Sequence, residues 1–85
     1  MKVLIPSPLR SYTQRSWVDG AGATLGDVLD DLDRQFPGIR FRLVNEQDRL
    51  RPHVRVFVRG TPVFDLGLML SPDDEVLIVQ ALSGG

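Results

Sequence analysis

Apolar residues along this chain recur at two different spacings, one typical of strands and one of a helix. Residues 53–59 alternate, with Val54, Val56 and Val58 on one face, which predicts a strand with one buried side. Residues 76–79 are apolar at every position, the pattern of a strand covered on both faces at the centre of a sheet. Shorter strands are predicted at residues 2–5, 15–19 and 63–64.

The helical spacing runs through residues 25–36. Thr24 can cap the helix start, and Asp27 three positions later completes a shortened capping box. Pro37 and Gly38 end the helix, because proline lacks the N–H and glycine favours a helix terminus. The predicted buried stripe follows the i, i+3, i+4, i+7 rhythm and consists of Leu25, Val28, Leu29, Leu32 and Phe36.

Turns and one loose segment connect these elements. Prolines, serines, glycines and aspartates predict turns at residues 6–11, 20–23, 60–62 and 71–74. Residues 39–52 predict an irregular or short helical segment, pinned by Ile39, Phe41, Leu43 and Leu50. The order strand, strand, helix, strand, strand, strand predicts an α+β fold, a mixed sheet of about five strands on one main helix. Residues 1–80 form this domain, and residues 81–85 follow as a flexible tail.

Composition narrows the possible functions. A chain of 85 residues can bury one core only. Its net charge of -1 lacks the positive field with which proteins bind nucleic acid, so no nucleic-acid partner is expected. The absence of cysteine excludes disulfides, thiolate nucleophiles and thiolate metal ligands. The apolar run in the opening nine residues ends at Pro6, far too short for the core of a signal peptide, and no stretch is long enough to span a membrane, so a cytoplasmic protein without a membrane partner is expected.

The C-terminus is the most informative stretch. It reads Ala81, Leu82, Ser83, Gly84, Gly85. Glycine makes up about 7% of residues in proteins, so two in the final positions arise by chance in roughly one chain in 200. The structural explanation for the two glycines is that chain ends are usually poorly ordered and place few demands on residue type. The chemical explanation is that Gly84 and Gly85, without side chains, can pass through a narrow cleft and present a bare carboxylate to a partner's active site.

Other candidate sites have simpler structural explanations. The glycine-rich stretch at residues 20–26 follows a strand and opens a helix, but its spacing differs from a dinucleotide-binding loop and no second parallel unit follows. The carboxylates of Asp27, Asp30, Asp31 and Asp33 lack the spacing of a calcium loop, so a solvated helix face is expected. His53 is the only histidine, which leaves neither a zinc site nor a catalytic triad; no metal and no catalytic side chain are predicted.

Short matches along nearly the whole chain carry a family resemblance. They are Ile5-Pro6, Leu9-Arg10, Thr24-Leu25-Gly26, Asp31-Leu32, the strand from Val54 to Val58, Asp74-Glu75-Val76 and the Gly-Gly end. With these residues the chain resembles the ubiquitin-like sulfur carriers of the MoaD/ThiS family, which have the β-grasp fold. The opening matches and the segment with Gly38-Ile39 and Arg42-Leu43 are most similar to the carriers that supply sulfur for cysteine synthesis. The family commonly has glycine where Asp73 or Asp74 stands.

The resemblance implies a protein cosubstrate with no bound cofactor. An E1-like activating enzyme would use ATP to adenylate the Gly85 carboxylate, and sulfur would then displace AMP to leave a C-terminal thiocarboxylate. A sulfur-accepting biosynthetic enzyme is the second implied partner, with cysteine formation favoured over a pterin, a thiazole or a secondary metabolite. Two alternatives within the family are the small subunit of molybdopterin synthase and a ubiquitin-like protein modifier.

A tail alone offers too little area for a specific complex, so a further contact surface is expected. In β-grasp carriers the first and last strands are central neighbours, with the strand at 53–59 beside them. If Val76 and Ile78 face the helix, alternation sends their neighbours outward. The alternative is that residues 40–52 cover this face. The predicted partner-binding surface, called the sheet patch below, comprises the apolar residues Leu4, Phe57, Leu77 and Val79 with Arg55 and Arg59 at its rim.

Overall fold

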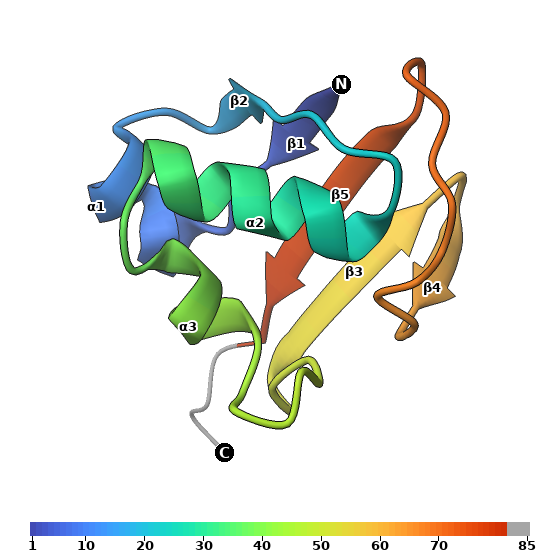
Figure 1. Ribbon diagram of the computed structural model, residues 1–85. Coiled ribbons are helices and arrows are strands. Elements are labelled where there is room, and N and C mark those ends of the chain that lie inside the picture. Colours follow the sequence, from blue (N-terminus) through green and yellow to red (C-terminus); the bar gives the residue numbers. More distant parts are fainter. Residues whose placement is uncertain (82–85) are drawn as a thin grey trace.

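A five-stranded mixed sheet forms one layer of the molecule, and helices cover one of its faces (Figure 1). The structure is a computed structural model that describes residues 1–81. The strands are β1 (Lys2–Leu4), β2 (Trp17–Asp19), β3 (Val54–Val58), β4 (Thr61–Val63) and β5 (Glu75–Gln80), and the helical elements are η1 (Ser7–Leu9), α1 (Arg10–Thr13), α2 (Leu25–Gln35) and α3 (Ile39–Leu43). The α+β class and the single main helix, α2, agree with the prediction.

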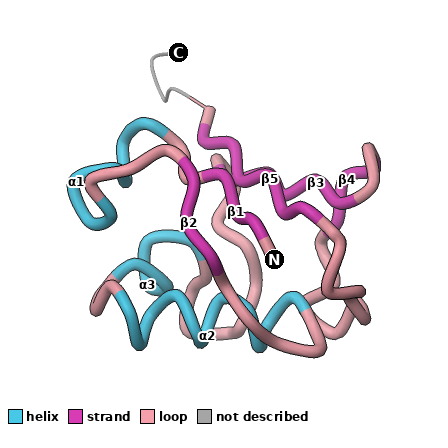
Figure 2. The backbone as a smooth tube through the Cα atoms, turned by 90° about the horizontal axis from the view of Figure 1, so that it is seen from above, coloured by secondary structure: helices cyan, strands magenta, loops and turns pink. Residues whose placement is uncertain are grey.

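The sheet order is β2-β1-β5-β3-β4. Strand β5 runs parallel to β1 and antiparallel to β3, so the last strand of the chain lies at the centre, as its doubly apolar sequence predicted. Figure 2 shows α2 and α3 together on one side of the strands. The opposite face of the sheet carries neither of these helices.

Helix α2 begins and buries its stripe as predicted. The Thr24 side chain accepts a hydrogen bond from the Asp27 backbone N–H, and the Asp27 carboxylate accepts one from the Thr24 N–H. The reciprocal pair satisfies two N–H groups that a helix start would otherwise leave free. Helix α2 ends at Gln35, before Pro37. Its fully buried residues are Leu25, Val28, Leu29 and Leu32, while Phe36 is half-buried against the same core.

Three local predictions were wrong or incomplete. The segment predicted as a turn at residues 6–11 is helical through η1 and α1. In α3, Ile39 and Leu43 are buried, but Phe41 lies two positions from each on the other side of the helix and is 60% exposed. Strand β4 begins at Thr61, earlier than predicted, because Arg59 and Gly60 both take positive φ (53° and 77°) and form a two-residue hairpin turn; it ends at Val63, before Phe64.

The turn before β5 forms without the glycine that the family commonly carries. The Asp74 N–H donates to the Ser71 carbonyl at 2.9 Å, and neither Asp73 nor Asp74 has positive φ. A residue with a side chain therefore fits both positions. No helix in the described residues is long and apolar enough to cross the membrane.

Candidate functional site

The predicted reacting tail begins where β5 ends. Strand β5 stops at Gln80, and the Ala81 N–H continues the pairing by donating to the His53 carbonyl at 2.8 Å. Ala81 itself is exposed. The predicted positions Leu82, Ser83, Gly84 and Gly85 lie outside the described residues.

The strand that carries this tail is held from both sides. Strand β1 pairs with β5 from Glu75 to Leu77, and β3 pairs with it from Val76 to Gln80, so the last three residues of β5 pair with β3 alone. On the helical side, Val76 and Ile78 are 0% and 1% exposed. The base of the tail, Gln80 and Ala81, is therefore held to the sheet through β3 and the residue before it, His53.

The apolar residues of the sheet patch lie on the face opposite the helices. Leu77 stands in register with Leu4 on one side and Phe57 on the other, so three strands contribute to one row. These three side chains are half-buried, and Val79, in register with Arg55, is 44% exposed. The row is contiguous because cross-strand neighbours have Cβ atoms about 5 Å apart.

Residues 40–52 do not cover this face. Leu43 and Val44 of that segment are 1% exposed and belong to the core under the sheet. Figure 2 places α3 with α2 on the helical side. The outer face therefore remains open at the sheet patch.

Sequence reasoning missed one large member of this row. Trp17 in β2 is in register with Leu4 and is 42% exposed. On the far side, Pro62 in β4 is in register with Phe57, which carries the apolar row across all five strands. Burial of Val18 next to Trp17 is the alternation that could have placed the indole outward.

The two rim arginines differ in how much charge they leave available. The Arg55 Nη1 donates to the carbonyls of Pro52 and Val54 at 2.6 and 3.1 Å, so its charge has no carboxylate partner there. Arg59 forms an ion pair with Asp74. The backbone N–H of Ser71 and then the Arg59 guanidinium hold the pKa of Asp74 below its usual range. Arg59 is therefore a partly neutralised rim residue.

The aspartates of α2 serve the fold. Asp31 accepts from the Ala21 N–H at 3.0 Å, and this bond, together with those from Gln35 and Arg34, lowers its pKa. Asp33 accepts from the backbone N–H groups of Gly38 and Arg40, both at 3.1 Å. Within residues 1–81, no three His, Cys, Asp or Glu side chains are grouped so that they could hold a metal ion.

Comparison with known proteins identifies a matching family and relatives of this chain. The ThiS family profile matches residues 3–85. The chain is 37% identical over 90 residues to the sulfur carrier protein CysO of Mycobacterium tuberculosis, covering 98% of this chain and 96% of that protein. It is 35% identical over 72 residues to small archaeal modifier protein 3 of Haloferax volcanii, covering 81% of this chain and 77% of that protein.

Solved structures with the same fold agree. A chain of the Amycolatopsis orientalis BexX/CysO complex matches with a TM-score of 0.90 and 32% identity, covering 99% of this chain and 98% of that one. Crystalline CysO from Mycobacterium tuberculosis matches with a TM-score of 0.89 and 31% identity, covering 95% and 98%. These neighbours share the five-stranded sheet and its main helix, which confirms the predicted fold.

Proposed function

The chain belongs to the ThiS family, and we propose from this that it is a sulfur carrier, a protein cosubstrate whose reacting group is the carboxylate of Gly85. The observation that carries the proposal is the Gly84-Gly85 terminus in the sequence, which follows four residues after the last residue of the central strand β5. Similarity to CysO over 98% of the chain supports it. The protein itself supplies no catalytic side chain.

The proposed chemistry explains how a chain without cysteine can carry sulfur. A free carboxylate is a poor electrophile, so a partner of the E1 type first transfers AMP from ATP to the Gly85 carboxylate and releases pyrophosphate. A sulfur nucleophile then attacks the acyl carbon and displaces AMP, which is a good leaving group. The product is a C-terminal thiocarboxylate, a soft nucleophile that stays attached to its carrier. ATP belongs to the activating partner, and the carrier binds no cofactor.

The sheet patch is the proposed binding surface for the activating enzyme. Its apolar row, Leu4, Leu77 and Phe57, lies open on the outer face with charged residues at the edge. Exposed apolar patches with a polar rim are typical of partner surfaces. Trp17, which extends the row, adds a residue type that often dominates binding energy.

The proposed acceptor of the sulfur is a cysteine-forming enzyme. Similarity to the sulfur carrier protein CysO supports this branch over a pterin acceptor. In the proposed reaction the thiocarboxylate sulfur bonds to the β-carbon of a serine-derived substrate held by a pyridoxal-phosphate enzyme, and the oxygen group on that carbon departs. A protease then hydrolyses the acyl bond between the carrier and the product and frees the amino acid. Loss of molybdoenzyme activity with intact cysteine synthesis, after deletion of the gene, would contradict this acceptor.

A second function, protein modification, has one observation in its favour. The chain is 35% identical over 72 residues to small archaeal modifier protein 3. A modifier would use the same adenylated tail but transfer it to a lysine amine. Lys2 is the only lysine in the chain, so building polymers through internal lysines would depend on that single residue.

Pyrophosphate release tests the first chemical step. The intact protein, its cognate activating enzyme and ATP are expected to release pyrophosphate, and the variant without Gly85 is expected to release none. A chain ending in Gly84 that supports the same rate would refute the assignment of Gly85 as the reacting residue.

A further inference from the structure

A groove lies at the base of the tail, on a different part of the surface from the sheet patch. Its volume is about 590 Å³. Segments far apart in sequence form it: η1, α1, α3, the approach to β3 and the end of β5. We call it the tail-root groove, and its lining includes Tyr12, Phe41, Arg42, Arg51, His53 and Gln80.

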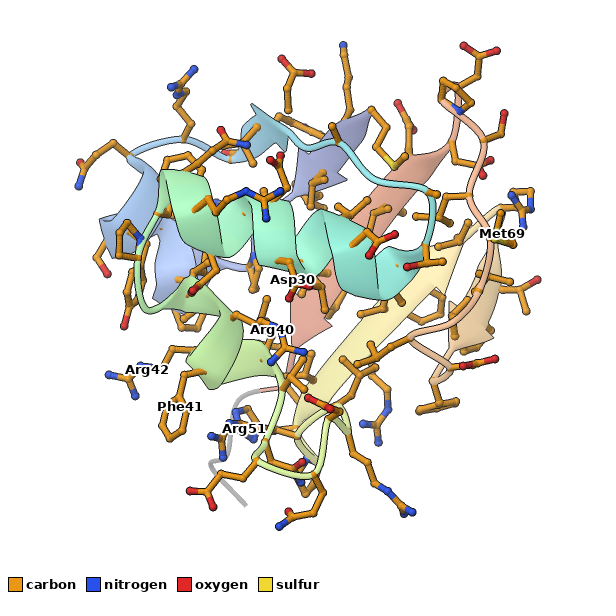
Figure 3. All side chains as sticks on the ribbon, viewed as in Figure 1. Asp30, Arg40, Phe41, Arg42, Arg51 and Met69 are labelled. Atoms are coloured by element: carbon orange, nitrogen blue, oxygen red, sulfur yellow. The ribbon has the colours of Figure 1, made fainter. Side chains whose placement is uncertain are left out.

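Each of two arginines in the groove is hydrogen-bonded through its Nε atom, which leaves its outer guanidinium nitrogens available to a ligand. The Arg42 Nε donates to the Tyr12 hydroxyl at 3.0 Å, and the Arg51 Nε donates to the Phe41 carbonyl at 2.7 Å. The Arg51 guanidinium also lies 4.6 Å from the centre of the Phe41 ring, a cation–π contact. Figure 3 shows Phe41, Arg42 and Arg51 together at this end of the molecule. The fixed Nε atoms leave the outer nitrogens oriented before any ligand arrives, which lowers the entropy cost of binding.

The positive charges of Arg42 and Arg51 are also not balanced by a nearby carboxylate among the described residues. Among the described residues, Arg34, Arg40 and Arg59 each lie within 4 Å of an aspartate carboxylate. Arg42 and Arg51 have no such partner in residues 1–81, and no Asp or Glu lines the groove. The groove is therefore a local positive site on a chain whose net charge is -1.

A neutral acceptor lies beside the two cations. The Gln80 Oε1 atom is buried and has no hydrogen-bond donor within the described residues. A ligand that fits would supply carboxylates to Arg42 and Arg51, and an N–H to Gln80 once the Gln80 amide turns toward the groove. A polypeptide segment rich in Asp or Glu supplies both, whereas a bare phosphate supplies acceptors alone.

The position of the groove, next to the start of the tail, indicates which partner polypeptide would lie near it. Gln80 lines the groove, and Ala81 is bonded to the carbonyl of His53, another lining residue. Four residues extend at most about 14 Å. A partner that takes Gly85 into its active site must bring the rim of that site close to the groove.

We propose that the tail-root groove binds an acidic segment at the entrance of the activating enzyme's cleft, and so acts as an electrostatic contact separate from the sheet patch. The inference rests on the proposed carrier function. In the complex the tail extends into the partner, and the groove faces the rim around it. Long-range attraction between this groove and acidic residues would speed association and orient the tail toward the cleft.

Charge reversal tests the proposal. Arg42→Glu and Arg51→Glu are each expected to weaken binding to the cognate activating enzyme about fivefold to tenfold at low salt. The loss should shrink to within about twofold at 0.5 M salt, because screening suppresses the repulsion. The matched control is Arg34→Glu, which makes the same charge change on α2 beside Asp31 and is expected to leave binding within about twofold. Circular dichroism checks folding; Arg42→Glu, at an exposed position, carries the test if Arg51→Glu unfolds.

The other outcomes contradict the proposal in different ways. Faster adenylation after charge reversal would mean that the groove holds the protein's own tail. A higher KM for ATP with unchanged protein binding would mean that it holds a nucleotide phosphate. Equal effects of Arg34→Glu and Arg42→Glu would mean that only net charge matters. If the wild type is adenylated normally and neither reversal alters binding, the groove inference fails alone; if the wild type is not adenylated at all, the carrier function fails with it.

Discussion

Replacing Leu77 by arginine tests whether the outer face of β5 binds the partner while the opposite, buried face of the strand stabilises the fold. Leu77 is half-buried between Leu4 and Phe57, and each cross-strand contact of this kind contributes roughly 0.2–1 kcal/mol. The free protein should therefore lose about 1 kcal/mol of unfolding free energy. Complete burial of a leucine contributes about 1.5–3 kcal/mol, so covering the exposed half contributes about 1 kcal/mol to a complex. An unpaired arginine in an apolar contact costs about a further 1–2 kcal/mol.

The predicted binding loss is thus about 2–3 kcal/mol, or roughly 30- to 150-fold in Kd. Isothermal titration with the activating enzyme measures it, and urea unfolding measures stability. Ile78→Ala is the matched control, because Ile78 is the next residue and only 1% exposed. That variant should lose about 2–5 kcal/mol of stability. If Leu77→Arg unfolds the protein as strongly as Ile78→Ala, Leu77 belongs to the core and the binding surface lies elsewhere.

Three further variants test other parts of the account. Thr24→Ala should lower the free energy of unfolding by about 1 kcal/mol in urea titrations, since it removes the α2 cap; an unchanged midpoint would contradict the capping role. Asp74→Asn should destabilise the protein at pH 7, because the Ser71 N–H and Arg59 favour the charged carboxylate. That stabilisation is lost as pH falls below about 4 and through the lowered pKa of Asp74, so the two proteins should converge in acid; a gap that persists there would refute the linkage. Deleting Gly85 should leave the thermal midpoint unchanged, whereas a large drop would show that the terminus packs on the domain.

Elements with a repeating pattern could be predicted from the sequence. Alternation in β3 and the apolar run in β5 carried the strand assignments, and the Thr24 and Asp27 pair carried the start of α2. Each of these signals is local, because strand and helix periods are properties of neighbouring residues. The outward direction of Leu77 followed from the same alternation once its buried neighbours were identified.

Short helices and the tail-root groove could not be predicted in this way. Helix α1 has four residues, about one turn, which is too few to show a period, and the prolines and serines of residues 6–11 are equally typical of turns. Helix α3 shows only Ile39 and Leu43 inward, so Phe41 was placed in the core by its hydrophobicity alone. The groove brings Tyr12 to Arg42, 30 positions apart, and no local pattern records such a contact.

The central claim is that sulfur resides on the last residue of this chain. Reaction with the cognate activating enzyme, ATP and sulfide, followed by fragmentation of the intact protein in a mass spectrometer, tests it most directly. We expect one oxygen to be replaced by sulfur, and the added mass to be present in every fragment that contains Gly85 and in no fragment that lacks it. A mass change located on any internal residue, or a C-terminus left as an ordinary carboxylate, would contradict the account.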